Sequence, residues 1–284
     1  MKLNALLEMY GLDLNRKIKI VRHKDENRGY DLQKLYQLDQ LNIYQSFQKK
    51  DVFSECDFIV TFLGLENSKA LFVGVYEVKN TRSANEVPIP KHFHYYESFK
   101  QSKKFYYDMN EVEGFDDLKD RLIIKWSGNA INWHQWLKNT NMEVIQILPK
   151  GYIKSFTGYM DVVLTHPMLK KIIENPDANQ DWHQMLSNVA GVYLIVDTNT
   201  GLQYVGSAYG KDGILGRWKD YAKNGHGDNK ELMKLVQKDP SYSHNFQFSI
   251  LETLSKSLTK NEVLIKEKKW KEKLGSKAHG LNLN

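Results

Sequence analysis

The chain has 284 residues, of which 41% are hydrophobic and 26% charged, a composition typical of a folded globular protein rather than a disordered one. Its length favours two domains. It has no apolar run near the ~20 residues that a membrane-spanning helix needs, and its first residues lack the apolar core of a signal peptide. We therefore expect a cytoplasmic protein with no membrane partner.

The single cysteine, Cys56, excludes an internal disulfide framework and a multi-cysteine metal site. The formal net charge is +6, and residues 185–284 hold most of the excess, with 15 basic against 10 acidic side chains. The rest of the chain is nearly balanced, with 25 against 24. A basic surface favours polyanions such as nucleic acid, although many proteins without such a partner are equally basic.

Residues 1–165 are predicted to form a mainly β domain with a few helices. Asp31 is predicted as the N-cap of a helix that runs to Phe47. Two strongly apolar segments, 58–63 and 70–76, are expected to pair as antiparallel strands. The other predicted elements are a helix over 2–12, strands over 17–21, 105–109, 122–126 and 143–148, a long loop over 80–104, and a helical or turn-like segment over 132–136.

Residues 166–188 are predicted to be a helical connector. Pro167 suits the first turn of a helix through Glu174, and a second helix is expected from about Asn179 to Ser187. Residues 189–284 then form the last predicted domain, which contains the most informative pattern in the chain.

In this last domain an apolar run with Tyr193 is expected to be a strand, followed by a turn and a second short strand that carries Tyr204. Arg217 follows in the first turn of a predicted helix, and Tyr221 lies four residues later on the same face. Each of these residues, taken alone, is more often a packed tyrosine or a surface arginine than a catalytic group.

Glu267 has the position that most needs a functional explanation. Thr259 and Glu262 form a capping box, which predicts that a helix starts there. Glu267 lies on a stripe of that helix that is otherwise apolar and consists of Val263, Trp270 and Leu274. A carboxylate facing the core is costly unless it is paired or bound to a cation. The alternatives are a buried salt bridge, to Arg217 or to a lysine, and a metal ligand.

The order and spacing of these elements resemble the GIY-YIG nuclease family over about residues 190–283. Gly191-Val192-Tyr193 and Tyr204-Val205-Gly206 stand where the family has its GIY and YIG elements, with Val for Ile in both. The resemblance implies a compact α/β module with a three-stranded antiparallel sheet flanked by helices, so the whole chain is expected to be of the α+β class. It also implies a metal-binding role for Glu267 and a catalytic set of Tyr193, Tyr204, Arg217, Tyr221 and Asn282.

By the resemblance, Arg217 stabilises charge on the phosphate, and Tyr193 orients or deprotonates the attacking water with Tyr204 beside it. An unperturbed tyrosine has a pKa of ~10, so nearby cations would have to lower the pKa of Tyr193 for it to act as a base. Tyr221 stands where family members have His or Tyr and would assist proton transfer, with His226 as an alternative. The single carboxylate, with waters and substrate phosphates, suits Mg²⁺ or Mn²⁺.

The function expected from the resemblance is that of a divalent-metal-dependent DNA endonuclease, most like a restriction or other site-specific enzyme, acting on double-stranded DNA. Recognition of the target is assigned to residues 1–165, because a small nuclease module rarely has enough surface to read a sequence. Two alternatives stay open, namely a structure-specific repair or recombination nuclease and a catalytically inactive DNA-binding module.

Two further questions stay open at this point. Trp126, Trp133 and Trp136 are candidates for stacking on bases, including a modified base, although packing in the core or at its rim is the more frequent role of such residues. One active site per chain suggests either a homodimer on DNA or sequential nicking of the two strands.

Overall fold

The computed structural model describes residues 1–24, 29–99, 103–127, 132–140 and 142–282. The chain divides into two compact units, Met1–Leu148 and Pro149–Asn284. No helix within these described ranges is long and apolar enough to span a membrane.

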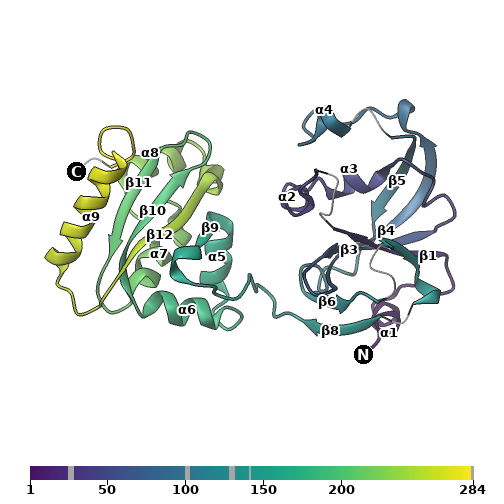
Figure 1. Cartoon of the computed structure of the whole chain (residues 1–284), viewed down its shortest axis with the longest axis horizontal. Helices are drawn as coiled ribbons and strands as arrows, with labels where there is room; N and C mark the ends of the chain where they lie inside the picture. The colour runs from purple at the N-terminus through teal and green to yellow at the C-terminus, as the bar shows by residue number, and fades with distance from the viewer. Residues whose placement is uncertain (25–28, 100–102, 128–131, 141, 283–284) are drawn as a thin grey trace. The chain divides into compact units, whose positions relative to one another are not determined.

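Within the described residues, the first unit is built on an eight-stranded sheet, which confirms its expected mainly β character (Figure 1). The strand order is β2-β5-β4-β3-β1-β7, with β6 pairing with both β4 and β8. β3 and β4 are antiparallel, as predicted, whereas β1 runs parallel to β3. The strands are β1 (Ile18–His23), β2 (Phe47–Gln48), β3 (Phe58–Gly64), β4 (Lys69–Ser83), β5 (Phe105–Glu111), β6 (Leu122–Lys125), β7 (His134–Trp136) and β8 (Glu143–Ile147).

Both faces of this sheet are covered by apolar clusters, which explains why its central strands are almost continuously apolar. Ile20 and Val60 belong to one cluster, whereas their neighbours Val21 and Ile59 belong to another. The first cluster also buries α1 (Leu3–Met9), which begins at the predicted place.

Three predictions for the first unit are corrected by the structure. The helix expected from Asp31 to Phe47 is two helices, because the chain turns at Asp39, whose φ is 57°. The loop expected over 80–104 begins with the end of β4 and contains two short helices. The helices concerned are α2 (Leu32–Gln37), α3 (Leu41–Ser46), η1 (Ala84–Glu86) and α4 (Tyr96–Phe99).

The third correction concerns residues 132–136, which were expected to be helical or turn-like and instead contain β7. β7 pairs antiparallel with β1, with Trp136 opposite Lys19 and His134 opposite Val21. This pairing joins segments that are far apart in the sequence, so the local pattern could not reveal it. The predicted N-cap is confirmed, because Asp31 accepts a hydrogen bond from the Lys34 amide at 2.9 Å.

The described part of the second unit contains a four-stranded antiparallel sheet in the order β11-β10-β12-β9. The expected sheet had three strands, and β9 is the additional one, pairing Leu164 with Phe248 of β12. β9 is only three residues long and precedes the motif-bearing region, which is why it was missed. The strands are β9 (Val163–Thr165), β10 (Ala190–Asp197), β11 (Gln203–Ala208) and β12 (Phe246–Leu254).

Helices cover both faces of this sheet (Figure 1). α5 (His166–Glu174), α6 (Gln180–Ser187) and α7 (Gly213–Asn224) pack in one apolar cluster, and α9 (Lys260–Leu274) packs in the other. α8 (Lys230–Lys238) and η4 (Pro240–Asn245) lie between α7 and β12 in the chain. The segment expected as a connector therefore contributes buried side chains, among them Leu169 and Trp182, to the core of the second unit.

Candidate active site

The register of β10 and β11 distributes the motif residues over the two faces of the sheet. Tyr193 lies opposite Gly206, and its side chain joins the cluster that α7 covers. The neighbouring pair, Val192 and Ser207, points to the face that α9 covers, where Val192 packs with Val263. β11 is an edge strand, so groups from both faces can meet at its border.

Both motif glycines lie where the chain leaves no room for a side chain. A Cβ on Gly206 would lie 2.5 Å from Oη and 2.6 Å from Cζ of Tyr193. A Cβ on Gly191 would lie 2.7 Å from the carbonyl oxygen of Glu252 and 2.9 Å from Cδ1 of Ile214. The ring of Tyr193 therefore depends on Gly206 for its position against β11.

Tyr193, Arg217 and Tyr221 form a hydrogen-bonded group. The two tyrosine hydroxyls are 3.1 Å apart, and Nε of Arg217 donates to Oη of Tyr193 at 3.3 Å. Nη2 of Arg217 donates to Oη of Tyr221 at 3.4 Å, and the guanidinium lies 4.9 Å from the centroid of that ring. α7 begins at Gly213, so Arg217 lies in its second turn rather than in the first, and Tyr221 follows one turn later on the same face, as predicted.

Tyr193 and Tyr221 are completely buried. Burial raises the pKa of Tyr193 far above its ordinary value, and the nearby Arg217 only partly offsets this shift. Burial also raises the pKa of Tyr221. Both hydroxyls are therefore protonated at neutral pH. The shift of the Tyr193 pKa is thus opposite in direction to the one that a base would require.

Glu267 projects from α9, and the side chain is 14% exposed. Its Oε1 lies 2.6 Å from Nζ of Lys271, and its Oε2 accepts a hydrogen bond from Oγ of Ser207. The predicted capping box starts α9, and the apolar stripe packs in the cluster on that face, as expected. An ion pair is thus present, and its partner is Lys271 rather than Arg217.

These residues meet at a hollow of about 580 Å³ at the border of β11, which we call the edge hollow. Tyr193, Tyr204, Arg217 and Glu267 all line it, together with Ser207. Of the two motif tyrosines, Tyr204 is the half-buried one and Tyr193 the fully buried one. The edge hollow therefore brings together four of the six predicted site residues.

The other two predicted residues, Tyr221 and Asn282, do not line the hollow but form hydrogen bonds with Tyr193 and with the backbone of β11. Tyr221 holds the hydroxyl of Tyr193. Asn282 is buried and pairs with the backbone of Val205: its Oδ1 accepts from the amide and its Nδ2 donates to the carbonyl, both at 2.8 Å. The alternative residue, His226, lies in the turn after α7, where its Nδ1 accepts from the amide of Asp228 at 3.0 Å. Asn282 therefore holds the strand between Tyr204 and Gly206.

Comparison with known proteins places this arrangement in a family. Residues 189–282 match the model of the GIY-YIG catalytic domain. These residues form a GIY-YIG domain. Endonuclease activity on DNA follows from this domain at the family level, and GIY-YIG nucleases generally use a divalent metal ion.

Similar solved structures include two of the catalytic domain of the intron endonuclease I-TevI, one of them a mutant form. Each is 29% identical to the present chain and covers 34% of it, and the chain covers 94% and 98% of the two structures. The TM-scores are 0.27 and 0.26. A search of curated protein sequences gave no match.

The polar groups of the GIY-YIG domain fit a hydrated divalent ion rather than a closed metal site. Among the residues that the structure describes, no three His, Cys, Asp or Glu side chains gather into a cage. Mg²⁺ keeps several waters and is commonly held by one or two carboxylates plus substrate phosphates. Glu267 offers such a carboxylate at the edge hollow, and each of its oxygens keeps a lone pair beyond the bond it already accepts.

Sequence reasoning missed two polar residues of the GIY-YIG domain and left a third, Lys271, unnamed as the lysine of the salt-bridge alternative. Lys271 stands four residues after Glu267, which is the spacing of an ion pair on a helix, but it is one of several lysines there. Ser207 follows the motif glycine directly, and nothing in its sequence context signals its contact with α9. Glu252 of β12 anchors α9 by accepting from Nζ of Lys266 at 2.9 Å and from Nε1 of Trp270 at 2.8 Å.

Proposed function

We propose that the protein is a divalent-metal-dependent DNA endonuclease that cuts double-stranded DNA at specific sites, with the target read by the N-terminal unit. The observation that carries the catalytic part is the edge hollow, where Glu267 and Arg217 face a shared space of about 580 Å³. A carboxylate that can hold a metal ion and a cation that can contact a phosphate are the groups that a metal-assisted hydrolysis of a phosphodiester uses.

Arg217 supplies the positive charge in this proposal. Its guanidinium remains protonated at any physiological pH and presents planar paired donors, which match phosphate oxygens. Hydrogen bonds to Tyr193 and Tyr221 and an ion pair to Asp220 at 3.3 Å hold it at the wall of the hollow. It is therefore preorganised to stabilise charge that develops on the phosphate.

The tyrosines bind and orient in this proposal. The neutral hydroxyl of Tyr193 accepts from Arg217 and fixes it at the hollow, and the half-buried Tyr204 is placed to hold a water molecule. A divalent ion bound at Glu267 would supply Lewis acidity, which lowers the pKa of a bound water and neutralises a leaving oxygen. Asn282 keeps β11, and with it Tyr204, in place.

Target reading is assigned to the N-terminal unit because the proposed catalytic chemistry leaves that unit without another role. The GIY-YIG domain accounts for the chemistry, whereas the unit Met1–Leu148 has its own core and contributes nothing that the catalytic proposal uses. Its aromatic residues include Trp133 and Trp136, which are half-buried and pack at the margin of a core cluster.

The test is to incubate the purified chain with long duplex DNA and Mg²⁺, with Mn²⁺ and EDTA in parallel, and to sequence the ends. Fragments with one recurrent sequence at the cut are expected. Cleavage confined to flaps or junctions would favour the structure-specific nuclease instead. DNA binding without cleavage in either metal would favour the inactive binding module.

A further inference from the structure

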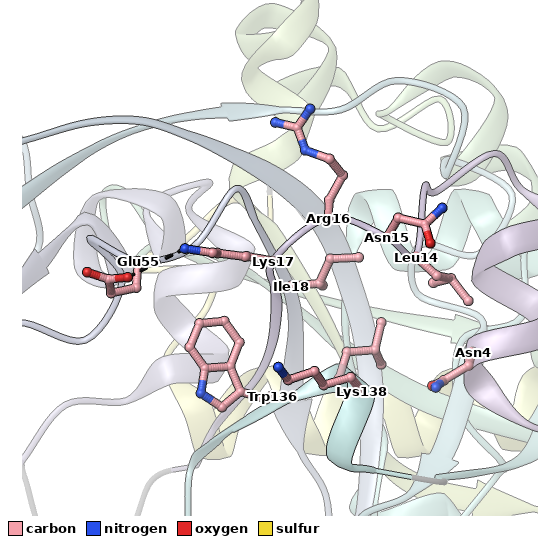
Figure 2. Close-up of a pocket in the computed structure, with 10 residues that line it drawn as sticks. Asn4, Leu14, Asn15, Arg16, Lys17, Ile18, Glu55, Trp136 and Lys138 are labelled. Atoms are coloured by element: carbon pink, nitrogen blue, oxygen red, sulfur yellow. Dashed lines mark ion pairs between the residues drawn. The ribbon is translucent and has the colours of Figure 1, made fainter.

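A second hollow, of about 240 Å³, lies in the first unit, and we call it the Trp136 hollow (Figure 2). It opens between α1, the segment before β1 and the end of β7. Its volume lies below the range of roughly 300–1,000 Å³ typical of sites for drug-sized ligands, so it suits a small ring rather than an extended molecule. Its apolar lining comes from Leu14, Ile18 and Leu137, of which the last two are buried core residues.

The indole of Trp136 forms one wall of this hollow (Figure 2). Strand pairing places Trp136 opposite Lys19, and Nζ of Lys19 lies 4.5 Å from the ring centroid. The same ammonium donates to the carbonyl of Val52 at 2.5 Å, so it is fixed in position. The indole of Trp136 is thus fixed by Lys19 and lines the hollow. Aromatic side chains in such a position can stack with a planar ring.

Asn4 lines the hollow, and its side chain carries an unused acceptor. Leu3, Leu6 and Leu7 anchor α1 in the core, which fixes Asn4 beside them. Its Oδ1 is buried and accepts no hydrogen bond from any described residue. A buried polar atom without a partner is unfavourable, so a ligand that donates a hydrogen bond to it gains affinity. Asparagine amides pair with bases that carry an exocyclic amino group.

The rim of the hollow is cationic. Arg16 is held by Asp57 at 3.1 Å, and Lys17 by Glu55 at 3.6 Å. Lys138 is exposed and forms no ion pair with any residue that the structure describes. It is therefore the cation available to an anionic group that reaches the rim.

We propose that the Trp136 hollow binds one nucleotide unit. The base stacks on Trp136, its exocyclic amino group donates to Oδ1 of Asn4, and its phosphate contacts Lys138. A base extruded from DNA and a free nucleotide share this chemistry. Binding of an extruded base rests on the proposed endonuclease function, whereas binding of a free nucleotide does not.

The first experiment titrates the full-length chain with deoxyadenosine monophosphate and follows tryptophan fluorescence. Saturable quenching is expected, and thymidine monophosphate, whose base lacks an exocyclic amino group, should bind about tenfold more weakly, the equivalent of one hydrogen bond. Asn4→Leu and Lys138→Met should each weaken binding by about tenfold, and Trp136→Phe should remove most of the signal. Lys125→Met, a matched change at an exposed lysine outside the hollow, should bind as the parent does.

The second experiment distinguishes the two sources. Duplex DNA that the parent cuts is prepared with 2-aminopurine near the cut and bound to the Glu267→Ala variant. Extrusion followed by stacking on the indole is expected to give weak 2-aminopurine fluorescence in the Glu267→Ala complex and a clear rise when Trp136→Leu is added, and this difference identifies the extruded base. Quenching of tryptophan by the mononucleotide without this difference identifies the free nucleotide.

The inference is overturned if neither ligand gives a signal, or if the signal is the same in Asn4→Leu, Lys138→Met and the parent. Its failure is distinguishable from failure of the proposed function. A parent that cuts DNA without these signals refutes the Trp136 hollow alone, and a parent that binds the nucleotide without cutting DNA refutes the endonuclease alone.

Discussion

Lys271 and Glu267 form an ion pair with Nζ 2.6 Å from Oε1, and the two side chains are only 12% and 14% exposed. The pair lies one helical turn apart on α9, beside the edge hollow. The other carboxylate oxygen accepts from Ser207. Before any metal binds, the protein therefore neutralises its own candidate metal ligand with an internal cation.

Replacing this cation should strengthen metal binding. In Lys271→Met, a positive charge beside the metal position is removed, so we expect Mn²⁺ to bind about tenfold more tightly in the absence of DNA. Isothermal titration calorimetry measures this directly. Lys268→Met, at an exposed lysine of the same helix, serves as the control and should change the affinity little. An affinity in Lys271→Met equal to that of the parent would show that the ion pair does not compete with the metal.

The buried tyrosine pair should make stability fall in alkaline solution. Burial raises the pKa of Tyr221 in the folded protein. The contribution of the neutral Tyr221 hydroxyl to stability is therefore complete below about pH 10, where tyrosines of the unfolded chain are also protonated. This contribution is lost as the pH rises from there toward the pKa of the folded protein. The free energy of unfolding should therefore fall less steeply above pH 10 in Tyr221→Phe, by about 1 kcal/mol per pH unit.

Denaturant titrations at pH 9, 10 and 11 test this difference. Tyr209→Phe, which removes the hydroxyl of a residue that is 43% exposed, is measured in parallel as the matched control. Parallel slopes for the parent and Tyr221→Phe would contradict the assignment of a neutral, buried hydroxyl pair.

The close approach of Gly206 to Tyr193 predicts a strong effect of a single methyl group. In Gly206→Ala the new Cβ would overlap Oη and Cζ of the ring, so the ring or the strand must shift, which disturbs the hydrogen bond between Tyr193 and Arg217. We expect a loss of cleavage of about a hundredfold and a loss of stability of about 2 kcal/mol.

A double-mutant cycle with Tyr193→Ala checks the cause of the Gly206→Ala effect. Once the ring is absent, adding Gly206→Ala should cost little further stability. Additive losses in the double variant would mean that the glycine is needed for another reason.

Asn282 should be needed for the strand rather than for the chemistry. Asn282→Ala removes two buried hydrogen bonds to Val205 and leaves both backbone groups unpaired, at a cost of about 2–4 kcal/mol in the free energy of unfolding. Metal affinity should be unchanged, because Asn282 does not line the edge hollow. Isothermal titration calorimetry of Mn²⁺ binding, at a temperature low enough to keep Asn282→Ala folded, measures the metal affinity. A large loss of this affinity would show that Asn282 contributes to the metal site.

Local patterns in the sequence predict much of the second unit. The capping box of Thr259 and Glu262, the apolar stripe of α9 and the four-residue spacing from Arg217 to Tyr221 are all present in the structure. Such features depend on residues within a turn or two of each other. The family resemblance, which rests on the order of short motifs, is likewise confirmed for residues 189–282.

What the sequence could not predict depends on pairing over long distances. The contact of Ser207 with Glu267 requires the register of β11 and the packing of α9 together. The strand β7 exists because Trp136 meets Lys19 of β1, and the break between α2 and α3 depends on one residue, Asp39, in a left-handed conformation. None of these leaves a periodic pattern in the chain.

The most direct test of the catalytic proposal compares Glu267→Gln with the parent. The substitution keeps the shape of the side chain and removes its negative charge, so it should remove metal binding at the edge hollow while the fold persists. Plasmid cleavage in Mg²⁺ should become undetectable, and DNA binding in a gel-shift assay should stay within about twofold of the parent. Cleavage by Glu267→Gln at the rate of the parent would contradict the account.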